Sequence, residues 1–318
     1  MKKYIIYLIL LVVALLTSFA CSTRLPFDDG NNNSSSGSNN LGTGQIEIKV
    51  YPDPDEKNRV SFDAITNKIT IDWGDGNIDK LTPNGASQEF IHTYANQNLQ
   101  TISIESEKLV GFGGQDGIFK EMYLGEMNNL ERLNIRSKLT VLEIKKAKSL
   151  TSLICDGNQL TSLDVSGLTA LELLYCTSNQ LTSLDLSGLN ALIALDCSLN
   201  RLTSLNLSDL NALRTLDCSW NQLTSLDIRG LKNIKGINCS FNKFNINTVN
   251  LLLENLPTLP SSAPPDWYDS FRNYYWYYFF RDNFGYVAFG SIRITAYPGG
   301  IDGINKTIAT NKGWSVNP

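Results

Sequence analysis

The chain has 318 residues, of which 42% are hydrophobic and 18% are charged, and its formal net charge is −4. This length suggests two or three domains, and the hydrophobic fraction is that of a globular protein with a buried core. The charges are scattered and form no basic stripe, which argues against a nucleic-acid partner and against a lysine-rich membrane-surface segment after residue 3.

Residues 1–21 have the pattern of a signal peptide. Lys2 and Lys3 precede an almost wholly apolar run from Tyr4 to Leu16, and small and polar residues follow up to Cys21. The apolar run is shorter than the roughly 20 residues that span a bilayer, which disfavours an uncleaved transmembrane anchor. A Cys in this place resembles the lipoprotein signal of Bacteroidetes, although the residues before it depart from the strictest motif. The resemblance implies that Cys21 is lipidated, and that a lipid anchors the protein at the outer membrane or cell surface of a Gram-negative bacterium.

Residues 22–44 are predicted to form a disordered linker. The stretch 31–40 contains only Asn, Ser and Gly. Such a segment cannot bury enough apolar surface to offset the entropy cost of ordering it. We expect it to hold the folded part away from the membrane.

Residues 45–110 are predicted to form an antiparallel β-sandwich. Apolar residues alternate with polar ones in four runs, around Ile48, Phe62, Ile71 and Ile102, and turn residues separate the runs. The strings WGDG, at 73–76, and HTY, at 92–94, resemble the PKD-type immunoglobulin-like module of surface proteins. The resemblance implies a spacer or adhesion module without chemistry of its own.

Residues 111–243 are predicted to form a solenoid, because five blocks of 21 residues follow one another without interruption from Leu139 to Lys243. Each block contains L-x-x-L-x-C-x-x-N-x-L, which resembles the leucine-rich repeat of internalins. The resemblance implies a parallel sheet with about 4.8 Å between rungs and leucines inside. A degenerate repeat around Leu133 precedes the blocks, and Phe119, Met122 and Leu124 are expected to form a more irregular first rung.

Two repeated polar residue types are interpreted as structural. The Cys residues recur every 21 residues, and the only His in the chain, His92, lies in another domain, so converging metal ligands are lacking and no metal or cofactor is expected. We expect the thiols to be small buried hydrophobes. The Asn residues recur with the same period, and their amides are expected to satisfy backbone groups in the turn after each strand. The two series are Cys155, Cys176, Cys197, Cys218 and Cys239, and Asn158, Asn179, Asn200, Asn221 and Asn242.

Asp196 and Asp217 are expected to lie at the same concave position of adjacent rungs, about 5 Å apart. Two carboxylates at this spacing match a retaining glycosidase. An open concave sheet would provide no enclosing pocket to raise the pKa of one of them, and both residues simply repeat the LDCS consensus. The chain is therefore predicted not to be an enzyme.

Residues 244–318 are predicted to cap the solenoid. A short helix is expected at 247–256, a strand at 290–297 and a second helix at 304–312. The final string TIATNKGWSV resembles the closing segment of Bacteroidetes leucine-rich-repeat lipoproteins. Between the first helix and the strand lies an insert in which ten of the fourteen residues at 267–280 are aromatic.

The candidate ligand-binding residues are large aromatic side chains near the C-terminal rungs. Apolar residues accumulate at the position before the repeat Asn, which should be polar, and a cap of this length cannot cover every ring of the insert. Packing within the cap is the alternative explanation of the insert. The candidates are Trp220 and Phe241 at that position, Trp267, Tyr275 and Tyr277 in the insert, and Tyr175, which is expected beside Asp196 on the concave face.

The sequence as a whole predicts a mainly β protein with short helical caps, in which an immunoglobulin-like or PKD-like sandwich precedes a leucine-rich-repeat solenoid. The predicted function is recognition of a protein or glycan ligand at the cell surface. A glycan-processing enzyme or an accessory glycan-binding subunit is the alternative.

Overall fold

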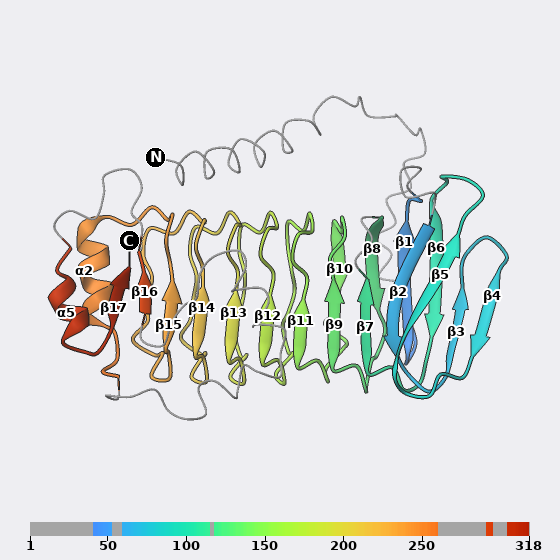
Figure 1. Ribbon diagram of the computed structural model, residues 1–318, viewed down its shortest axis with the longest axis horizontal. Helices are drawn as coiled ribbons and strands as arrows, with labels where there is room; N and C mark the ends of the chain where they lie inside the picture. The colour runs from blue at the N-terminus through green and yellow to red at the C-terminus, as the bar shows by residue number, and fades with distance from the viewer. Residues whose placement is uncertain (1–40, 53–58, 115–117, 260–290, 295–303, 318) are drawn as a thin grey trace. The chain divides into compact units, whose positions relative to one another are not determined.

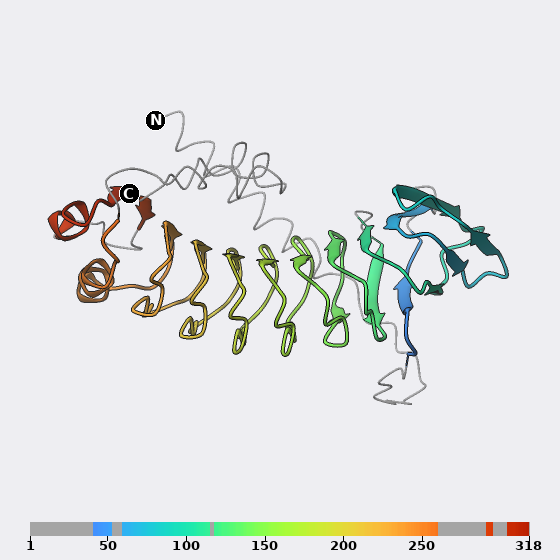
Figure 2. The same cartoon turned by 90° about the horizontal axis from the view of Figure 1, so that it is seen from below.

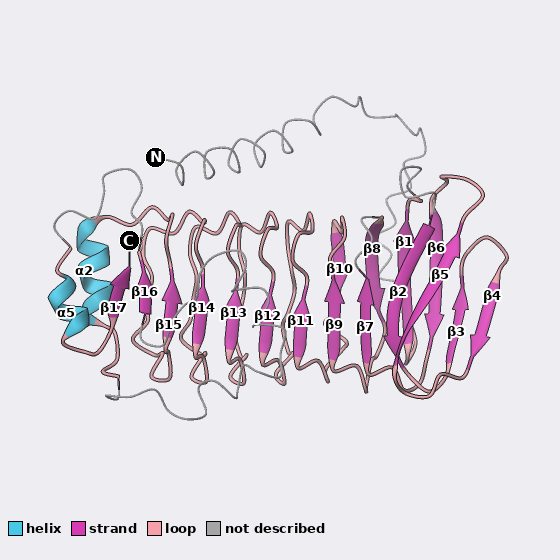
Figure 3. Cartoon of the chain, in the orientation of Figure 1, coloured by secondary structure: helices cyan, strands magenta, loops and turns pink. Residues whose placement is uncertain are grey.

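A computed structural model describes residues 41–52, 59–114, 118–259, 291–294 and 304–317, and these residues are mainly β. Their strands stand side by side and lead into two helices near the C-terminal end (Figures 1 and 3). Cys21 and three predicted binding residues, Trp267, Tyr275 and Tyr277, lie outside the described residues. Neither described helix has the length and apolar character needed to cross a membrane.

The first six strands form antiparallel pairs in two sheets. In one sheet β1 pairs with β6, β6 with β3, and β3 with β4, whereas β2 pairs with β5 in the other. Their alternating apolar residues point inward, as the period of two predicts: Ile48, Phe62, Ile71 and Ile102 are at most 2% exposed. The strands are β1 (Gln45–Val50), β2 (Arg59–Ile65), β3 (Ile69–Asp72), β4 (Ile78–Leu81), β5 (Ser87–Thr93) and β6 (Gln100–Glu105).

The WGDG turn and the HTY strand meet in one aromatic cluster. The His92 ring stacks on Trp73 at 4.8 Å between centroids, and its Nε2 lies 2.7 Å from Asp75 Oδ2. The Tyr94 hydroxyl donates to the Trp73 carbonyl, and Gly74 has a φ of +83°, a value that a side chain would make costly. The His therefore has packing and hydrogen-bonding partners within the N-terminal sheets.

Both N-terminal sheets continue into the solenoid without a break. β2 pairs antiparallel with β7 (Gly111–Gly114), which pairs in parallel with β9 (Arg132–Ile135). β1 pairs antiparallel with β8 (Phe119–Leu124), which pairs in parallel with β10 (Val141–Glu143). Hydrogen bonding thus crosses the boundary predicted at 110/111. Phe119, Met122 and Leu124 lie on β8, at the back of the first rung, whereas β7 forms its front.

The predicted linker reaches into the folded part. The Gly44 N–H donates to the Glu126 carbonyl at 2.8 Å, and the Gly44 carbonyl accepts from the Ser106 N–H at 2.9 Å. The prediction that disorder extends to residue 44 is therefore wrong at its C-terminal end, because these two bonds hold Gly44 against both flanking segments.

The regular rungs stack in strict register (Figure 2). Five strands pair in parallel, and one leucine or isoleucine of each strand faces the same position of the next. These inward residues, Leu153, Leu174, Leu195, Leu216 and Ile237, are at most 1% exposed. The strands are β11 (Ser152–Ile154), β12 (Leu173–Tyr175), β13 (Ala194–Asp196), β14 (Thr215–Asp217) and β15 (Gly236–Asn238).

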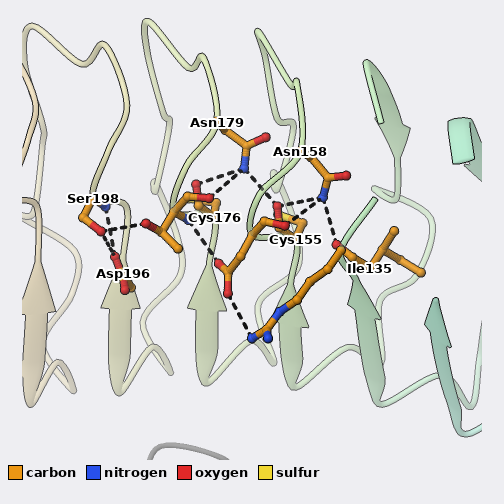
Figure 4. Close-up of polar contacts among 10 residues, drawn as sticks. Ile135, Cys155, Asn158, Cys176, Asn179, Asp196 and Ser198 are labelled. Carbon is orange, nitrogen blue, oxygen red and sulfur yellow. Dashed lines mark hydrogen bonds and ion pairs between the residues drawn. The ribbon is translucent and has the colours of Figure 1, made fainter. Parts of the chain in front are cut away.

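The repeat Asn residues link neighbouring rungs. The Asn179 amide donates to the Cys155 carbonyl of the preceding rung and to the Cys176 carbonyl of its own, at 2.9 and 3.1 Å (Figure 4). Its Oδ1 accepts from the Leu160 N–H at 3.1 Å. The five repeat cysteines are fully buried thiols that form no disulfide, and burial raises the pKa of each. Both ladders agree with the structural interpretation.

Two helices and two strands close the last rungs. α2 (Ile246–Glu254) begins at the N-cap Asn245, and α5 (Lys306–Thr310) packs against it. β16 (Ser291–Arg293) pairs with β15, and β17 (Ser315–Asn317) pairs with β16. Lys312 Nζ donates to carbonyls at the end of α2, where a cation suits the helix dipole, and Trp314 Nε1 donates to the Pro257 carbonyl at 2.7 Å. The closing string therefore ties the chain end to α2.

Candidate functional site

The outward face of the parallel sheet carries a polar column in register. Tyr175, Asp196, Asp217 and Asn238 are direct neighbours on β12 to β15, because successive strands pair at this position. Strand residues alternate between faces, so the residues two positions further on form a second column, which includes Thr177 and Ser198. The sequence predicted the first column correctly.

A chain of hydrogen bonds connects the two columns across the rungs (Figure 4). Arg136 Nη2 lies 3.3 Å from Asp156 Oδ2, and the other carboxylate oxygen, Asp156 Oδ1, accepts from the Thr177 N–H. The Thr177 and Ser198 hydroxyls are 2.8 Å apart, and Ser198 Oγ donates to Asp196 Oδ1 at 2.6 Å. Since the Ser198 hydrogen is used on the carboxylate, Thr177 is the donor to Ser198. The polar face is therefore tied together rather than loosely solvated.

The two aligned carboxylates lie in a buried environment, so the expectation of an open one is wrong. Asp196 is 4% exposed and Asp217 is 5% exposed. Each folds back onto its own strand, because Ser198 and Ser219 donate both a backbone N–H and a hydroxyl to them. Burial, followed by the nearby Asp217, raises the pKa of Asp196 well above its ordinary value.

Further along the face, the buried Asp156 also has an altered pKa. Burial raises it to about 6, and the nearby Arg136 and the Thr177 N–H oppose this rise. No cluster of three or more potential metal-ligating side chains occurs in the described part of the chain. The arrangement can therefore offer hydrogen bonds and a variable charge, but no converging set of metal ligands within those residues.

Predicted residue Tyr175 belongs to the polar face and lies apart from the other two described candidates. Its side chain stands between the positions of Ile154 and Asp196 on the neighbouring strands. Burial, with the nearby Asp196 and Asp156, raises the pKa of the phenol well above its ordinary value. Trp220 and Phe241 instead lie in the turn that follows each strand.

That turn has a left-handed backbone in every regular rung. The position before the repeat Asn has a φ between +52° and +66° throughout the five rungs. Left-handed backbone suits Gly or Asn and costs other residues about 1–2 kcal/mol. Only the first of these five regular rungs has such a residue, Gly157. The five residues are Gly157, Ser178, Leu199, Trp220 and Phe241.

The last three of these residues form a surface that we call the apolar ridge: Leu199, Trp220 and Phe241. Leu199 is 37% exposed, and Trp220 and Phe241 are partly exposed. The Trp220 and Phe241 rings stack, with 4.0 Å between centroids and 20° between planes. The structure thus brings these two candidates into direct contact. The sequence indicated the unusual apolar residues, but it missed their backbone conformation, for which Gly157 was the available signal.

Comparisons with known proteins find structural similarity alone. No protein-family model and no curated protein matches the chain. Among solved structures, it is similar to the functional domain of InlJ from Listeria monocytogenes, which includes a cysteine ladder, at 36% identity and a TM-score of 0.38 over 43% of this chain and 30% of that one. An internalin, InlF, from the same species matches at 19% identity and a TM-score of 0.36, over 42% of this chain and 45% of that one.

A leucine-rich-repeat protein of Leptospira interrogans, LIC12759, is also similar, at 23% identity and a TM-score of 0.35, over 59% of this chain and 62% of that one. The chain therefore spans less than two thirds of each of these three structures. The leucine-rich-repeat solenoid of this protein is established by its own rungs, which repeat with the inward leucines, the Asn ladder and parallel pairing described above.

Proposed function

We propose that this protein is a binding module that recognises a protein partner through the apolar ridge and the adjoining polar face. The observation that carries the proposal is the left-handed backbone of Leu199, Trp220 and Phe241. Large apolar residues at such positions cost stability in the rungs themselves. Strained residues of this kind occur at functional sites, and partly exposed aromatic residues are frequent binding hot spots.

The setting that we propose for this recognition is the cell surface. In this proposal Cys21 carries lipid, residues 22 onward span the distance from the outer membrane of a Gram-negative bacterium, and the N-terminal sheets act as a PKD-like spacer. The C-terminal rungs then face the partner, and the protein performs no catalysis. The Cys21 signal and the Asn- and Ser-rich segment after it support this arrangement.

The glycan-related alternative is favoured by one observation, the pair of buried carboxylates Asp196 and Asp217 in neighbouring rungs. Both carboxylates, however, accept two hydrogen bonds from a serine of their own rung, and Asp217 accepts a further one from Asn238. Carboxylates held in this way are better suited to organising the face than to protonating a leaving group.

The experiment compares the mature chain with a double variant, Trp220→Asn with Phe241→Asn. Asn tolerates left-handed backbone, so relief of strain should offset the lost ring stacking of about 0.5–1.5 kcal/mol and leave folding intact. Ser178→Asn is the matched control, because it introduces Asn at the equivalent left-handed position of a rung outside the ridge. Each protein is immobilised and exposed to a membrane-protein extract of the source bacterium, to a glycan array, and to polysaccharides in a turnover assay.

We expect specific protein capture by the wild type and by Ser178→Asn, and at least a tenfold loss with the double variant. Equal capture by all three proteins would contradict the proposal. Ridge-dependent signals on the glycan array would favour glycan recognition instead, and polysaccharide turnover that Asp196→Asn abolishes would establish the enzyme alternative.

A further inference from the structure

The ring arrangement of the apolar ridge disfavours a sugar ligand. Sugars pack against aromatic rings face to face, and the faces of Trp220 and Phe241 that meet are closed to a ligand at 4.0 Å between centroids. Two stacked rings leave their edges for contact with a ligand, and Leu199, one rung before Trp220, is exposed. Ring edges and a leucine side chain are suited to aliphatic and aromatic side chains, which favours a protein segment.

The spacing of the ridge favours one backbone conformation of that segment. Successive rungs of a parallel sheet are about 4.8 Å apart, so Leu199 and Phe241, two rungs apart, are separated by roughly 10 Å along the stack. Helical residues at i and i+7 are about 10.5 Å apart along their axis, with i+3 or i+4 between them. Residues i and i+4 of a strand are about 13.5 Å apart. A helix therefore matches the ridge, and a strand is too long by several ångströms.

The charges beside the ridge favour an acidic segment. Arg201 and Lys243 lie two residues beyond Leu199 and Phe241, and both are exposed. The same repeat position holds only cations or glutamines in six successive rungs, although the chain as a whole has a net charge of −4. Those residues are Lys138, Gln159, Gln180, Arg201, Gln222 and Lys243. Lys243 Nζ also donates to Gln222 Oε1 at 2.9 Å, which holds this flank together across two rungs.

We propose that the apolar ridge binds an amphipathic α-helix of a protein partner, which lies along the stack of rungs. Apolar side chains at i, i+3 or i+4, and i+7 pack against Leu199, Trp220 and Phe241. Acidic side chains on one flank of the helix face Arg201 and Lys243. This inference rests on the proposed function and adds to it the shape and the charge of the partner.

The test selects peptides from a display library of random 16-residue sequences on the full mature chain. Binders that also recognise Trp220→Asn with Phe241→Asn are removed, and the remaining sequences are read. We expect apolar residues spaced by three and four, with Glu or Asp on one side of them. A selected peptide should become helical when bound, should bind Ser178→Asn as well as wild type, and should lose at least tenfold in affinity for Arg201→Glu with Lys243→Glu.

The other outcomes identify what would be wrong. Ridge-dependent peptides whose apolar residues alternate, or whose flank is basic, would overturn the helix inference while the proposed function stands. Selection of no ridge-dependent peptide would overturn the inference, and the capture experiment would then decide the proposed function separately. A concentration-dependent dimer that the double variant abolishes would make a second copy the occupant. Binding that appears only after Tyr275→Ser with Tyr277→Ser would make the chain's own insert the occupant.

Discussion

Replacement of Asn200 by Ala tests what the Asn ladder contributes to stability. The Asn200 amide donates to the carbonyls of Cys176, Cys197 and Ser198 at 2.9 to 3.1 Å, and Oδ1 accepts from the Leu181 N–H at 3.0 Å. Asn200 is only 8% exposed. The substitution removes every one of these contacts and inserts nothing that could replace them.

The expected loss follows from which partners keep another hydrogen bond. The carbonyls of Cys176, Cys197 and Ser198 still accept from Asn179 Nδ2, Asn221 Nδ2 and the Ser178 N–H, respectively. The N–H of buried Leu181 retains no hydrogen bond described in the structure, which costs about 1–3 kcal/mol. The two N–H groups of the Asn200 amide, which the three carbonyls share, add about 1 kcal/mol each, so we expect a total of about 3–5 kcal/mol.

The assay is urea denaturation followed by circular dichroism, with the denaturant slope checked for each variant. Asn211→Ala is the matched control, because that side chain is exposed and makes a single long contact to the Asp209 carbonyl at 3.4 Å. It should change the free energy of unfolding by less than about 0.5 kcal/mol. A loss below about 1 kcal/mol for Asn200→Ala, at an unchanged slope, would refute the conclusion that the Asn side chains provide the main hydrogen bonds to the backbone groups of these turns.

Three further predictions concern the core, the polar face and the anchor. Leu195→Asp should cost several kcal/mol in urea denaturation by burying an unpaired charge, whereas Cys197→Ala should cost about 1 kcal/mol, and unfolding by the Cys change would contradict an inert thiol. Because the folded pKa of Asp156 is raised to about 6, the folded state binds more protons than the unfolded one between about pH 4 and pH 6, and stability falls as pH rises through this window. Asp156→Asn should remove up to about 3 kcal/mol of that fall, and an unchanged pH profile of the melting temperature would contradict it. Cys21→Ala should move the protein from the membrane fraction to soluble or uncleaved forms; wild-type protein without an acyl group in mass spectrometry would contradict lipidation.

The regular part of the fold could be predicted from the sequence because its contacts repeat. A residue of one rung contacts the equivalent residue of the next, so the 21-residue period alone placed Leu195, Cys197 and Asn200 on the inside. The alternation in the N-terminal strands was equally informative, since Ile48 and Phe62 point to a buried face whatever strand lies beside them.

The junction between the N-terminal sheets and the solenoid could not be predicted in the same way. The pairing of β2 with β7 joins segments about 50 residues apart, and no repeated spacing connects Ala64 with Phe112. Sequence patterns indicate which residues are buried, but the partner strand depends on the whole arrangement. The same limitation explains why the burial of the Asp196 and Asp217 carboxylates was not predicted. The LDCS consensus contains the Ser that folds back on Asp196, yet the resulting burial became evident only with the strand geometry.

The position before the repeat Asn connects stability with the proposed site. Selection for stability alone would place Gly or Asn at all five left-handed positions, as in the first rung, where Gly157 occurs. Instead the residues become Leu, Trp and Phe towards the C-terminus, at about 1–2 kcal/mol each, in a domain whose total stability is typically about 5–15 kcal/mol. The stacked pair returns about 0.5–1.5 kcal/mol of this, beyond what the area buried by the two rings contributes. Because the cost in stability falls on Leu199, Trp220 and Phe241, we expect the benefit that offsets it to come from binding at these rungs. Replacement of these residues by Asn should therefore preserve the fold and abolish binding of the partner.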